Sequence, residues 1–485
     1  MATIAENLTL LKSTKAGIKA AIEAKGVSNV GDKFSDYPAK IASIPTGGST
    51  SGVSQWTGTV DRAGLTELGW STTDIDNFQA NVRWYDWQNP DYTVVDADKS
   101  ITDISQYRNN KNVRYAKMFD TSQATGMGNM FSGCSRLTTI PTLDTSKVTN
   151  MSAMFNGCFN LTSIPTLDTS KVTNMENMFY GCSSLTTIPA LNTSKVTRMD
   201  RTFESCSRLT SIPALDTSQV TIMSFMFSGC TSLTSIPALD TSKVTDMSSM
   251  FFECSRLASI PTLDTSQVTD MGNSFSACSS LISIPALDTS KVTDMSSMFF
   301  ECSRLASIPT LDTSQVTDMD SMFRGCTSLT SIPTLDTSKV TDMGSMFESC
   351  TSLTTIPALD TSKVTDMGSI FSSCTSLTTI ESIDFSSCTK TGSIFTPYLT
   401  YSKLTSIHVT GSISFSWTSG GFSRIPNLDF NSIKSILEAM NRCTNPETAK
   451  TMSFNSTMTD QDSQLTNLVS ECNGKGWTIT GLTIN

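Results

Sequence analysis

Cysteines are the most chemically versatile residues of this 485-residue chain, because thiols form disulfides, bind metal ions and act as nucleophiles. Most of the cysteines recur every 24 residues. Metal-binding cysteines usually come in close pairs such as Cys-x-x-Cys, and a spacing of 24 residues provides no such pair. A column of thiols needs suitable Cβ geometry for disulfides, and synthesis in the cytosol opposes oxidation. We therefore expect buried, reduced thiols and no metal site. Eleven of the 14 cysteines follow this spacing: Cys134, Cys158, Cys182, Cys206, Cys230, Cys254, Cys278, Cys302, Cys326, Cys350 and Cys374.

The other groups that could do chemistry are too sparse for an active site. His408 is the only histidine, and one copy gives no basis for a Ser-His-Asp triad, a Cys-His pair or a multi-histidine metal site. We expect it to be a structural residue in the strand-like run SIHVT. Paired catalytic carboxylates, a phosphate-binding glycine loop and a nucleophile elbow are absent from the sequence. The sequence thus predicts no enzyme activity and no cofactor.

An aspartate also recurs at the same spacing, and it supports two interpretations. A column of carboxylates could bind calcium, or each aspartate could cap a turn through its own side chain. Asn192 interrupts the series, and asparagine replaces aspartate easily in such a turn but brings no charge to a cation site. No glycine-rich calcium loop accompanies the series, so the sequence favours turn capping. The members are Asp144, Asp168, Asp216, Asp240, Asp264, Asp288, Asp312, Asp336 and Asp360.

All these residues belong to a repeat whose unit reads approximately LDTSKVTxMxxMFxxCxxLTSIPx. A single unit cannot bury its apolar side chains, whereas stacked units close a continuous core, so we expect a repeat solenoid. The run LTSIPTL predicts a short strand that pairs in parallel with its neighbours and ends near the proline. The spacing of Met151, Met154 and Phe155 predicts a single helical or 3-10 turn. Small residues before the cysteine, such as Gly133 and Gly157, would let the chain leave this turn tightly.

The unit resembles that of surface leucine-rich repeat proteins of the Bacteroides and Mycoplasma surface-antigen type, which read LDTSxVTxMxxMFxxCxxLxxIP. The resemblance covers residues 119–385, which we take as the solenoid. It implies a leucine-rich-repeat-like fold, with short parallel strands and short helical turns, in an adhesive or surface-exposed protein. Residues 235–271 and 283–319 are identical, which indicates that the array grew by duplication.

Residues 1–46 predict an α-helical module of a different kind. Leu8, Leu11, Ile18 and Ile22 lie at near-helical spacing and predict an amphipathic helix. The phrase AIEAKGVSNVGDKFSDYPAKIASI resembles an N-terminal segment of bacteriophage tail and fibre proteins. The resemblance implies attachment to other virion proteins through these helices.

Three further segments complete the predicted domain organisation. The run GGSTSG at 47–52 predicts a flexible linker. Residues 53–118 hold four of the six tryptophans and predict an N-terminal cap over the exposed end of the first coil. Residues 386–485 predict an irregular repeat around LTSIHV and a C-terminal cap, with a helix at FNSIKSILEAM and a strand at GKGWTITGLTIN.

Charge and hydropathy exclude several classes of partner. The formal net charge is −10 and no Lys/Arg cluster stands out, so nucleic acid is not an expected partner. No run of 18 apolar residues occurs, so we expect no membrane insertion. The N-terminus lacks an uninterrupted apolar segment followed by a small-residue cleavage site, so we expect no signal peptide.

A binding surface is expected where the repeats differ, because the core positions are constrained by packing. The residue after the repeated phenylalanine varies most and places aromatic and charged side chains on one line along the rod. Such side chains commonly anchor interfaces and stack on sugars. The alternative interpretation is sequence drift on a solvated edge. The candidate binding residues are Tyr180, Phe252, Phe300 and Arg324.

The leading hypothesis from the sequence is a bacteriophage head or tail fibre subunit, made in the host cytoplasm and released in virions by lysis. Its array would recognise a host cell-surface protein or glycan, and its N-terminal helices are compatible with a homo-trimer. The alternative is a bacterial cell-surface leucine-rich-repeat adhesin. A third hypothesis, an enzyme that acts on surface glycans, lacks a catalytic constellation in the sequence.

Overall fold

A computed structural model describes residues 121–122, 124–140, 142–390, 394–395, 400–401, 403–415, 422–443, 450–460 and 462–485. It also describes the backbone of two short strands, β1 (Thr93–Val95) and β2 (Val113–Ala116), which pair in parallel. The predicted helical module 1–46, the linker 47–52 and most of the predicted cap 53–118 lie outside the described residues.

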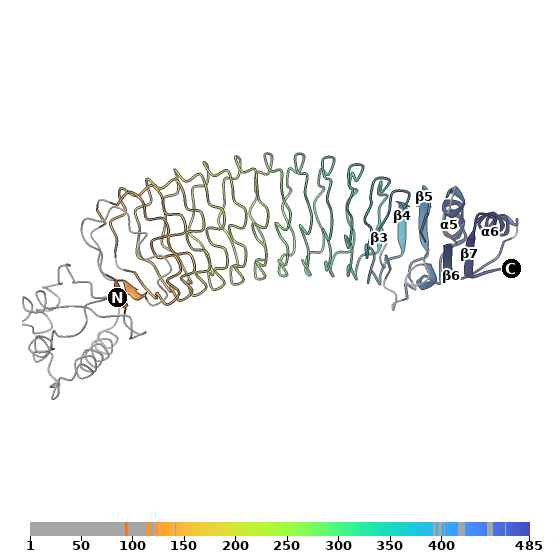
Figure 1. The fold of residues 1–485 in the computed structure, drawn as a ribbon, viewed down its shortest axis with the longest axis horizontal. Helices are drawn as coiled ribbons and strands as arrows, with labels where there is room; N and C mark the ends of the chain where they lie inside the picture. The colour runs from red at the N-terminus through yellow and green to blue at the C-terminus, as the bar shows by residue number, and fades with distance from the viewer. Residues whose placement is uncertain are drawn as a thin grey trace, which may run out of the picture.

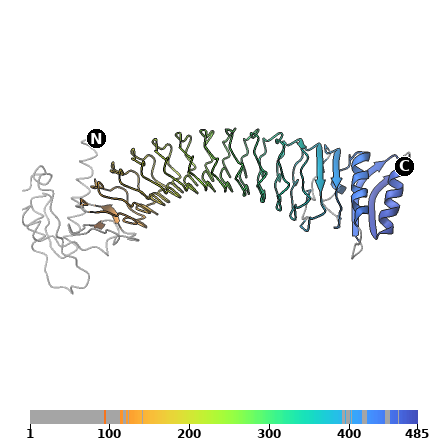
Figure 2. The ribbon, with the colours of Figure 1, turned by 90° about the horizontal axis from the view of Figure 1, so that it is seen from above.

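The repeats stack side by side into a curved rod (Figures 1 and 2). We number the coils 1 to 11 by their cysteines, from Cys134 to Cys374. Isolated parallel bridges join equivalent residues of neighbouring coils, starting with Gly126 and Asn150 and ending with Asp366 and Lys390. The predicted repeat solenoid is therefore the architecture of the coils that the structure describes.

The coils contribute nearly the same side chains to one continuous core, with Thr202 and Ser274 in place of the second methionine in coils 4 and 7. In coil 2, the phenylalanine and cysteine of the repeat, Phe155 and Cys158, are fully buried, as are Met151, Met154 and Leu161. The repeated phenylalanines form a column of parallel rings, with centroids 5.5–6.1 Å apart through coil 11. Burial of one such side chain stabilises the fold by about 1.5–3 kcal/mol. The stacked column repeats this contribution in every coil.

The segment from the first methionine to the cysteine is not the predicted helical turn. Met154 donates its N–H to the Met151 carbonyl at 3.2 Å, as in such a turn, but Ala153 has a left-handed φ of 53°. Instead, every second amide donates to a carbonyl oxygen of the next coil at 2.7–3.1 Å. The donors are the N–H groups of Met151, Ala153, Phe155 and Gly157. The prediction was wrong because pairing with the next coil requires these amides to point along the rod, which a helix does not allow.

The predicted strand in LTSIPTL forms only near the C-terminal end of the array. It appears as β3 (Thr355–Ile356), β4 (Thr379–Asp384) and β5 (Ser406–Thr410), which pair in parallel in this order. Proline removes one ladder donor and so limits the strand: β3 ends at Ile356, directly before Pro357, whereas β4 continues through Glu381, which replaces the proline. The expectation of a regular strand in every coil was therefore wrong, because the proline interrupts the hydrogen-bond ladder.

The corner that contains the repeated aspartate is held as predicted. The Asp144 carboxylate accepts hydrogen bonds from the Ser146 amide at 3.0 Å and from its hydroxyl at 2.7 Å. Thr145 is buried, and its hydroxyl donates to the Asp168 carbonyl of the next coil at 2.8 Å. Asn192 takes the place of the aspartate with the same two bonds. These contacts support the turn-capping interpretation of the series.

The cysteine column is buried, and its thiols are free. Each thiol from coil 2 onward donates to the carbonyl of the phenylalanine in the preceding coil, as Cys158 does to Phe131 at 3.1 Å. Burial raises the pKa of these thiols, to about 12 for Cys230 and Cys302. The thiols are therefore protonated hydrogen-bond donors at neutral pH, which makes them poor nucleophiles.

The C-terminal end adds a 3-10 helix η3 (Phe422–Arg424), helices α5 (Phe430–Arg442) and α6 (Gln464–Gly474), and strands β6 (Lys450–Met458) and β7 (Trp477–Ile484). In Figure 1 these elements continue the rod beyond β5. The predicted helix is α5, with Ile433, Ile436, Leu437 and Met440 buried, and the predicted strand is β7.

His408 lies in β5 as predicted, but its side chain is on the exposed side of the strand. It is therefore not a core residue. The part of the chain that the structure describes contains no candidate membrane-spanning helix.

Replacement of a core phenylalanine is expected to destabilise the rod far more than replacement of its neighbour. Phe251 is fully buried and Phe252 is half-exposed. Phe251→Ala should lower the free energy of unfolding by about 3–5 kcal/mol, because it leaves a cavity in the column. Phe252→Ala should change it by about 0.5 kcal/mol or less. Urea denaturation followed by circular dichroism measures both, and equal effects would contradict the assigned positions.

Alkylation tests the state of the cysteine column. At pH 8, iodoacetamide should leave the thiols of coils 2 to 11 unmodified in the folded protein, because they are buried with raised pKa values. The same thiols should react fully in denaturant, as read by mass spectrometry. Native-state alkylation at the denatured rate would show that the column is accessible.

Candidate functional site

Sequence variation among the coils is concentrated on one side of the rod. It falls in the stretch between the residue before the first methionine and the second residue after the cysteine, as from Asn150 to Asn160 in coil 2. The outward residues of this stretch form what we call the variable face. The remaining part of the coil, LxxIPxLDTSxVT, changes little from coil to coil. The variable face therefore differs from coil to coil, whereas the rest of each coil is nearly the same.

The structure places the four predicted binding residues in one column of the variable face. Tyr180, Phe252, Phe300 and Arg324 are all half-buried. The carbonyl of each accepts an N–H from the preceding coil at 2.6–2.7 Å, which holds the four residues in register. Their common line along the rod is thus a consequence of the backbone pairing.

Arg324 is engaged with both neighbouring coils. Its guanidinium lies 5.5 Å from the centre of the Phe300 ring and 3.2 Å from the Glu348 carboxylate. A second group of this type surrounds Arg201, which lies 4.2 Å from the Phe225 ring centre and 3.0 Å from Glu204. Arg201 and Phe225 were not predicted, because they lie outside the column of residues that follow the repeated phenylalanine, although their positions also vary between coils.

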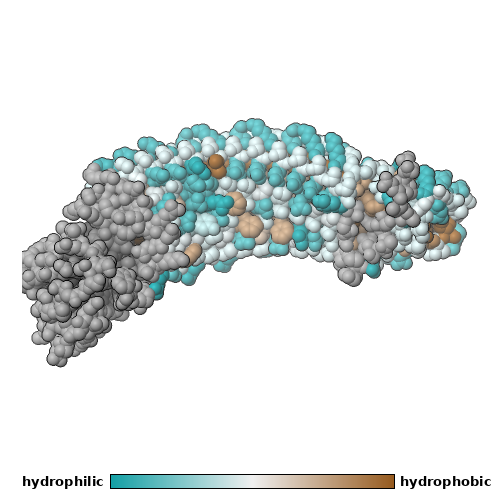
Figure 3. Space-filling model, in the orientation of Figure 1, coloured by the Kyte–Doolittle hydropathy of each residue, from teal (hydrophilic) through white to brown (hydrophobic). Residues whose placement is uncertain are grey.

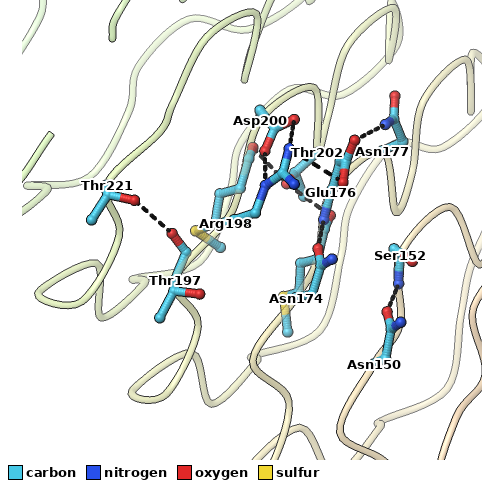
Figure 4. A network of polar contacts seen from close by, with 12 residues as sticks. Asn150, Ser152, Asn174, Glu176, Asn177, Thr197, Arg198, Asp200, Thr202 and Thr221 are labelled. Carbon is cyan, nitrogen blue, oxygen red and sulfur yellow. Dashed lines mark hydrogen bonds and ion pairs between the residues drawn. The ribbon is translucent and has the colours of Figure 1, made fainter. Parts of the chain in front are cut away.

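A polar network occupies the variable face at coils 2 to 4 (Figure 4). Arg198 forms ion pairs with Asp200 at 3.1 Å and with Glu176 of the preceding coil at 3.4 Å. Asn174 accepts the Glu176 amide at 2.8 Å, which positions the glutamate beside the arginine. Charges in this part of the face therefore neutralise one another.

The residue before the first methionine, which is Asn174 in coil 3 and Arg198 in coil 4, is an aspartate in each of coils 6 to 11. Each of these side chains accepts the N–H of the second residue after it, as Asp270 does from Gly272 at 2.9 Å. Burial, with the neighbouring carboxylates, raises the pKa of Asp270 and Asp318. Lys390 ends the series with an ion pair to Asp366 at 3.0 Å. We call Asp246, Asp270, Asp294, Asp318, Asp342 and Asp366 the acidic column.

The acidic column was not predicted, because the aspartate of LDTS is the more regular series in the sequence. The signal was present as VTD in these coils. Nowhere in the described part of the chain do three or more His, Cys, Asp or Glu side chains converge to hold a metal ion.

Hydrophobic side chains are scattered on the visible surface, which is otherwise hydrophilic (Figure 3). The most exposed large ones among the described residues are Phe159, at 52%, and Ile282, at 48%. Neither belongs to the predicted column.

One family model matches the chain in five overlapping windows: 99–211, 157–260, 197–307, 234–328 and 305–406. Its description is "Mycoplasma protein of unknown function, DUF285", and together the windows cover more than half of the chain. The chain belongs to this family. The match confirms the relationship to Mycoplasma repeat proteins, and the DUF285 windows span the predicted solenoid.

Solved structures with a similar repeat include a leucine-rich repeat protein of T. pallidum, with 22% identity over 34% of this chain and 76% of that one, at a TM-score of 0.27. A leucine-rich repeat protein of Eubacterium ventriosum shares 18% identity over 56% of this chain and 79% of that one, at a TM-score of 0.35. No curated protein matches the DUF285 chain.

Two aspartate substitutions are expected to change stability in opposite directions. Asp318 has a raised pKa, so its charged form destabilises the fold above that pKa. Asp318→Asn keeps the acceptor that Asn150 provides in coil 2, and it should raise the free energy of unfolding at pH 7 by about 0.2–1 kcal/mol. The difference should shrink as the pH falls through the raised pKa.

Asp264 serves as the matched control, because hydrogen bonds from Ser266 lower its pKa. Its charged form stabilises the fold, so Asp264→Asn should lower stability at pH 7. This loss should disappear as the pH falls from the ordinary aspartate pKa through the lowered one. Urea midpoints between pH 3 and pH 7 measure both variants, and the same sign for both would contradict the assignment.

Proposed function

We propose that this DUF285 protein is a non-enzymatic surface adhesin whose variable face binds a macromolecule on another cell. The observation that carries the proposal is the confinement of variation to one side of a rod whose other sides repeat almost unchanged. Drift on a solvated surface would also alter the exposed Ser and Thr positions of LTSIP, which stay small and polar in most coils.

The chemistry of the variable face supports a binding role. Its central column contains Tyr180, Phe252, Phe300 and Arg324, residue types that frequently anchor interfaces. They stand in register on a backbone that is hydrogen-bonded from coil to coil, which limits the conformational entropy lost when a partner binds. An extended partner could contact several coils at once.

The bacteriophage fibre hypothesis depends on residues 1–46, which lie outside the described residues, and no comparison adds support to it. The family match favours the adhesin hypothesis, because this hypothesis depends only on the repeat array that the family model covers. A location at the cell surface is part of the same proposal.

Cell binding by the full-length chain tests the proposed function. Flow cytometry on a panel of fixed bacterial and epithelial cells should show binding to at least one cell type. The variant Tyr180→Ala, Phe252→Ala, Phe300→Ala and Arg324→Ala should weaken that binding at least tenfold, about 1.4 kcal/mol, because it removes the anchors.

The control is a fourfold variant on the repeated side of the same rod: Ser163→Ala, Ser235→Ala, Ser283→Ala and Ser307→Ala. These serines are exposed, and their replacement should leave binding unchanged. The proposal fails if the full chain binds none of the cells, or if the two fourfold variants bind equally well.

A further inference from the structure

A groove of about 300 Å³ crosses coils 5 to 8 beside the predicted binding column. Two glutamates from coils 6 and 8 stand on either side of an alanine from coil 7, and hydroxyl groups line the rest. The lining residues are Thr231, Glu253, Ser255, Ala277, Ser279 and Glu301. A concave volume of this size accommodates a small ligand or one segment of a longer one.

The groove is built from a duplicated pair of residues. Because residues 235–271 and 283–319 are identical, the pair Phe252–Glu253 of coil 6 recurs as Phe300–Glu301 in coil 8. The two pairs lie about 10 Å apart, at two steps of the usual spacing of paired strands. Small residues replace the pair in the coil between them, which opens the groove there.

The two carboxylates of the groove have no hydrogen-bonding or ion-pair partner among the described residues. Glu253 and Glu301 are both exposed, and in the described part of the chain neither side chain forms a hydrogen bond or an ion pair. Other glutamates of the variable face behave differently, since Glu204 pairs with Arg201 and Glu348 pairs with Arg324. The groove thus offers two strong acceptors that the protein itself does not use.

The backbone beneath these glutamates is strained. Glu253, Ala277 and Glu301 have left-handed φ values of 58°, 59° and 54° at a position where coils 1, 2 and 3 have glycine. A left-handed conformation costs a residue with a side chain roughly 1–2 kcal/mol relative to glycine. Ser205, Ser349 and Ser373 hold the same conformation outside the groove, so this local cost to stability is not specific to it.

A buried hydroxyl beside the groove also lacks a partner. Ser276 precedes Ala277, is 1% exposed, and its Oγ forms no hydrogen bond. Serines at the same position in coils 1, 5 and 11 are 6–9% exposed, whereas Ser276 has phenylalanines at this position in both neighbouring coils. We attribute its deeper burial to the rings of Phe252 and Phe300. An unpaired buried hydroxyl is costly, but this one is closed off from solvent and does not line the groove, so it is not a contact for a ligand.

A chain of sugars matches this set of groups. Sugar rings present an apolar face that stacks on an aromatic ring, and their hydroxyls donate to carboxylates and exchange hydrogen bonds with Ser and Thr. Two free carboxylates and a net charge of −10 oppose an anionic ligand. The two pairs are separated by about the length of two sugars, and alternate sugars of an extended chain present the same face.

We propose that the groove binds a linear glycan of neutral or amino sugars that runs along the rod. The Phe252–Glu253 and Phe300–Glu301 pairs hold two sugars of the same orientation, and a third lies over Ala277. This inference rests on the proposed adhesive function and names the ligand class of the variable face.

A glycan array with the full-length chain tests this inference. Oligosaccharides of two to six neutral, amino or acidic sugars are compared, with oligoarginine as the alternative ligand. Binding should require at least three sugars and should be absent for acidic chains. The double variant Glu253→Gln and Glu301→Gln should weaken binding at least tenfold, because it removes both charged acceptors.

A variant that fills the groove gives a second, independent readout. Ala277→Glu should block glycan binding, and it should fold, because glutamate already occupies this position in coils 6 and 8. The matched control is Ser349→Glu, the same position in coil 10, which has a left-handed φ of 63°. The control should bind glycan as well as the unmodified chain does, and thermal unfolding confirms that both variants fold.

Three results would overturn the inference: no glycan bound by the unmodified chain, glycan binding unaffected by Ala277→Glu, or binding of oligoarginine alone with loss in the Gln double variant. These results remain separable from failure of the adhesin. Cell binding that needs the variable face but no glycan leaves the adhesin standing, whereas groove-dependent glycan binding without cell binding leaves only the groove.

Discussion

The rod depends on a backbone register in which each coil has the same length. Alternate amides between the first methionine and the cysteine donate to the next coil, so each residue lies beside its equivalent 24 positions later. One inserted residue in a coil would displace all of these pairs together. The side-chain columns follow from this register, because identical positions in the sequence become neighbours in space.

Stacking of like on like is favourable for some residue types and unfavourable for others. Phenylalanine rings and threonine hydroxyls form continuous columns, since each finds a suitable partner in its own kind or in the adjacent backbone. Lysines repel one another, and three of them are instead paired with glutamine of the preceding coil, as Lys243 is with Gln219 at 2.9 Å. The acidic column lacks such alternation, and the raised pKa values of Asp270 and Asp318 result from burial together with repulsion by the neighbouring carboxylates.

The repeat period was sufficient to predict the solenoid, the buried columns and the capped aspartate corner, because each follows from which residue types recur. The local backbone was harder to predict. The spacing of Met151, Met154 and Phe155 reports which side chains face inward, and both a helical turn and a chain of turns satisfy it. The left-handed residue that separates them is Ala153 in coil 2 and Arg201 in coil 4, and neither residue type signals that conformation. The candidate column could be predicted from its variation in the sequence. The groove could not, because it depends on how side chains from coils 5 to 8 pack beside one another.

Duplication has a specific consequence in a structure with a fixed register. Copying a two-coil unit reproduces its surface residues at a constant distance along the rod, so a single Phe–Glu pair becomes two pairs on the same line, the second with Arg324 beside its ring. A ligand with its own regular repeat can then contact both pairs at once, and the second contact costs less entropy than the first. Selection for a repetitive ligand would therefore favour duplication of these coils over independent change in each of them. The identity of 235–271 and 283–319 extends through the core as well as the surface, as expected when the whole unit was copied and the register preserved.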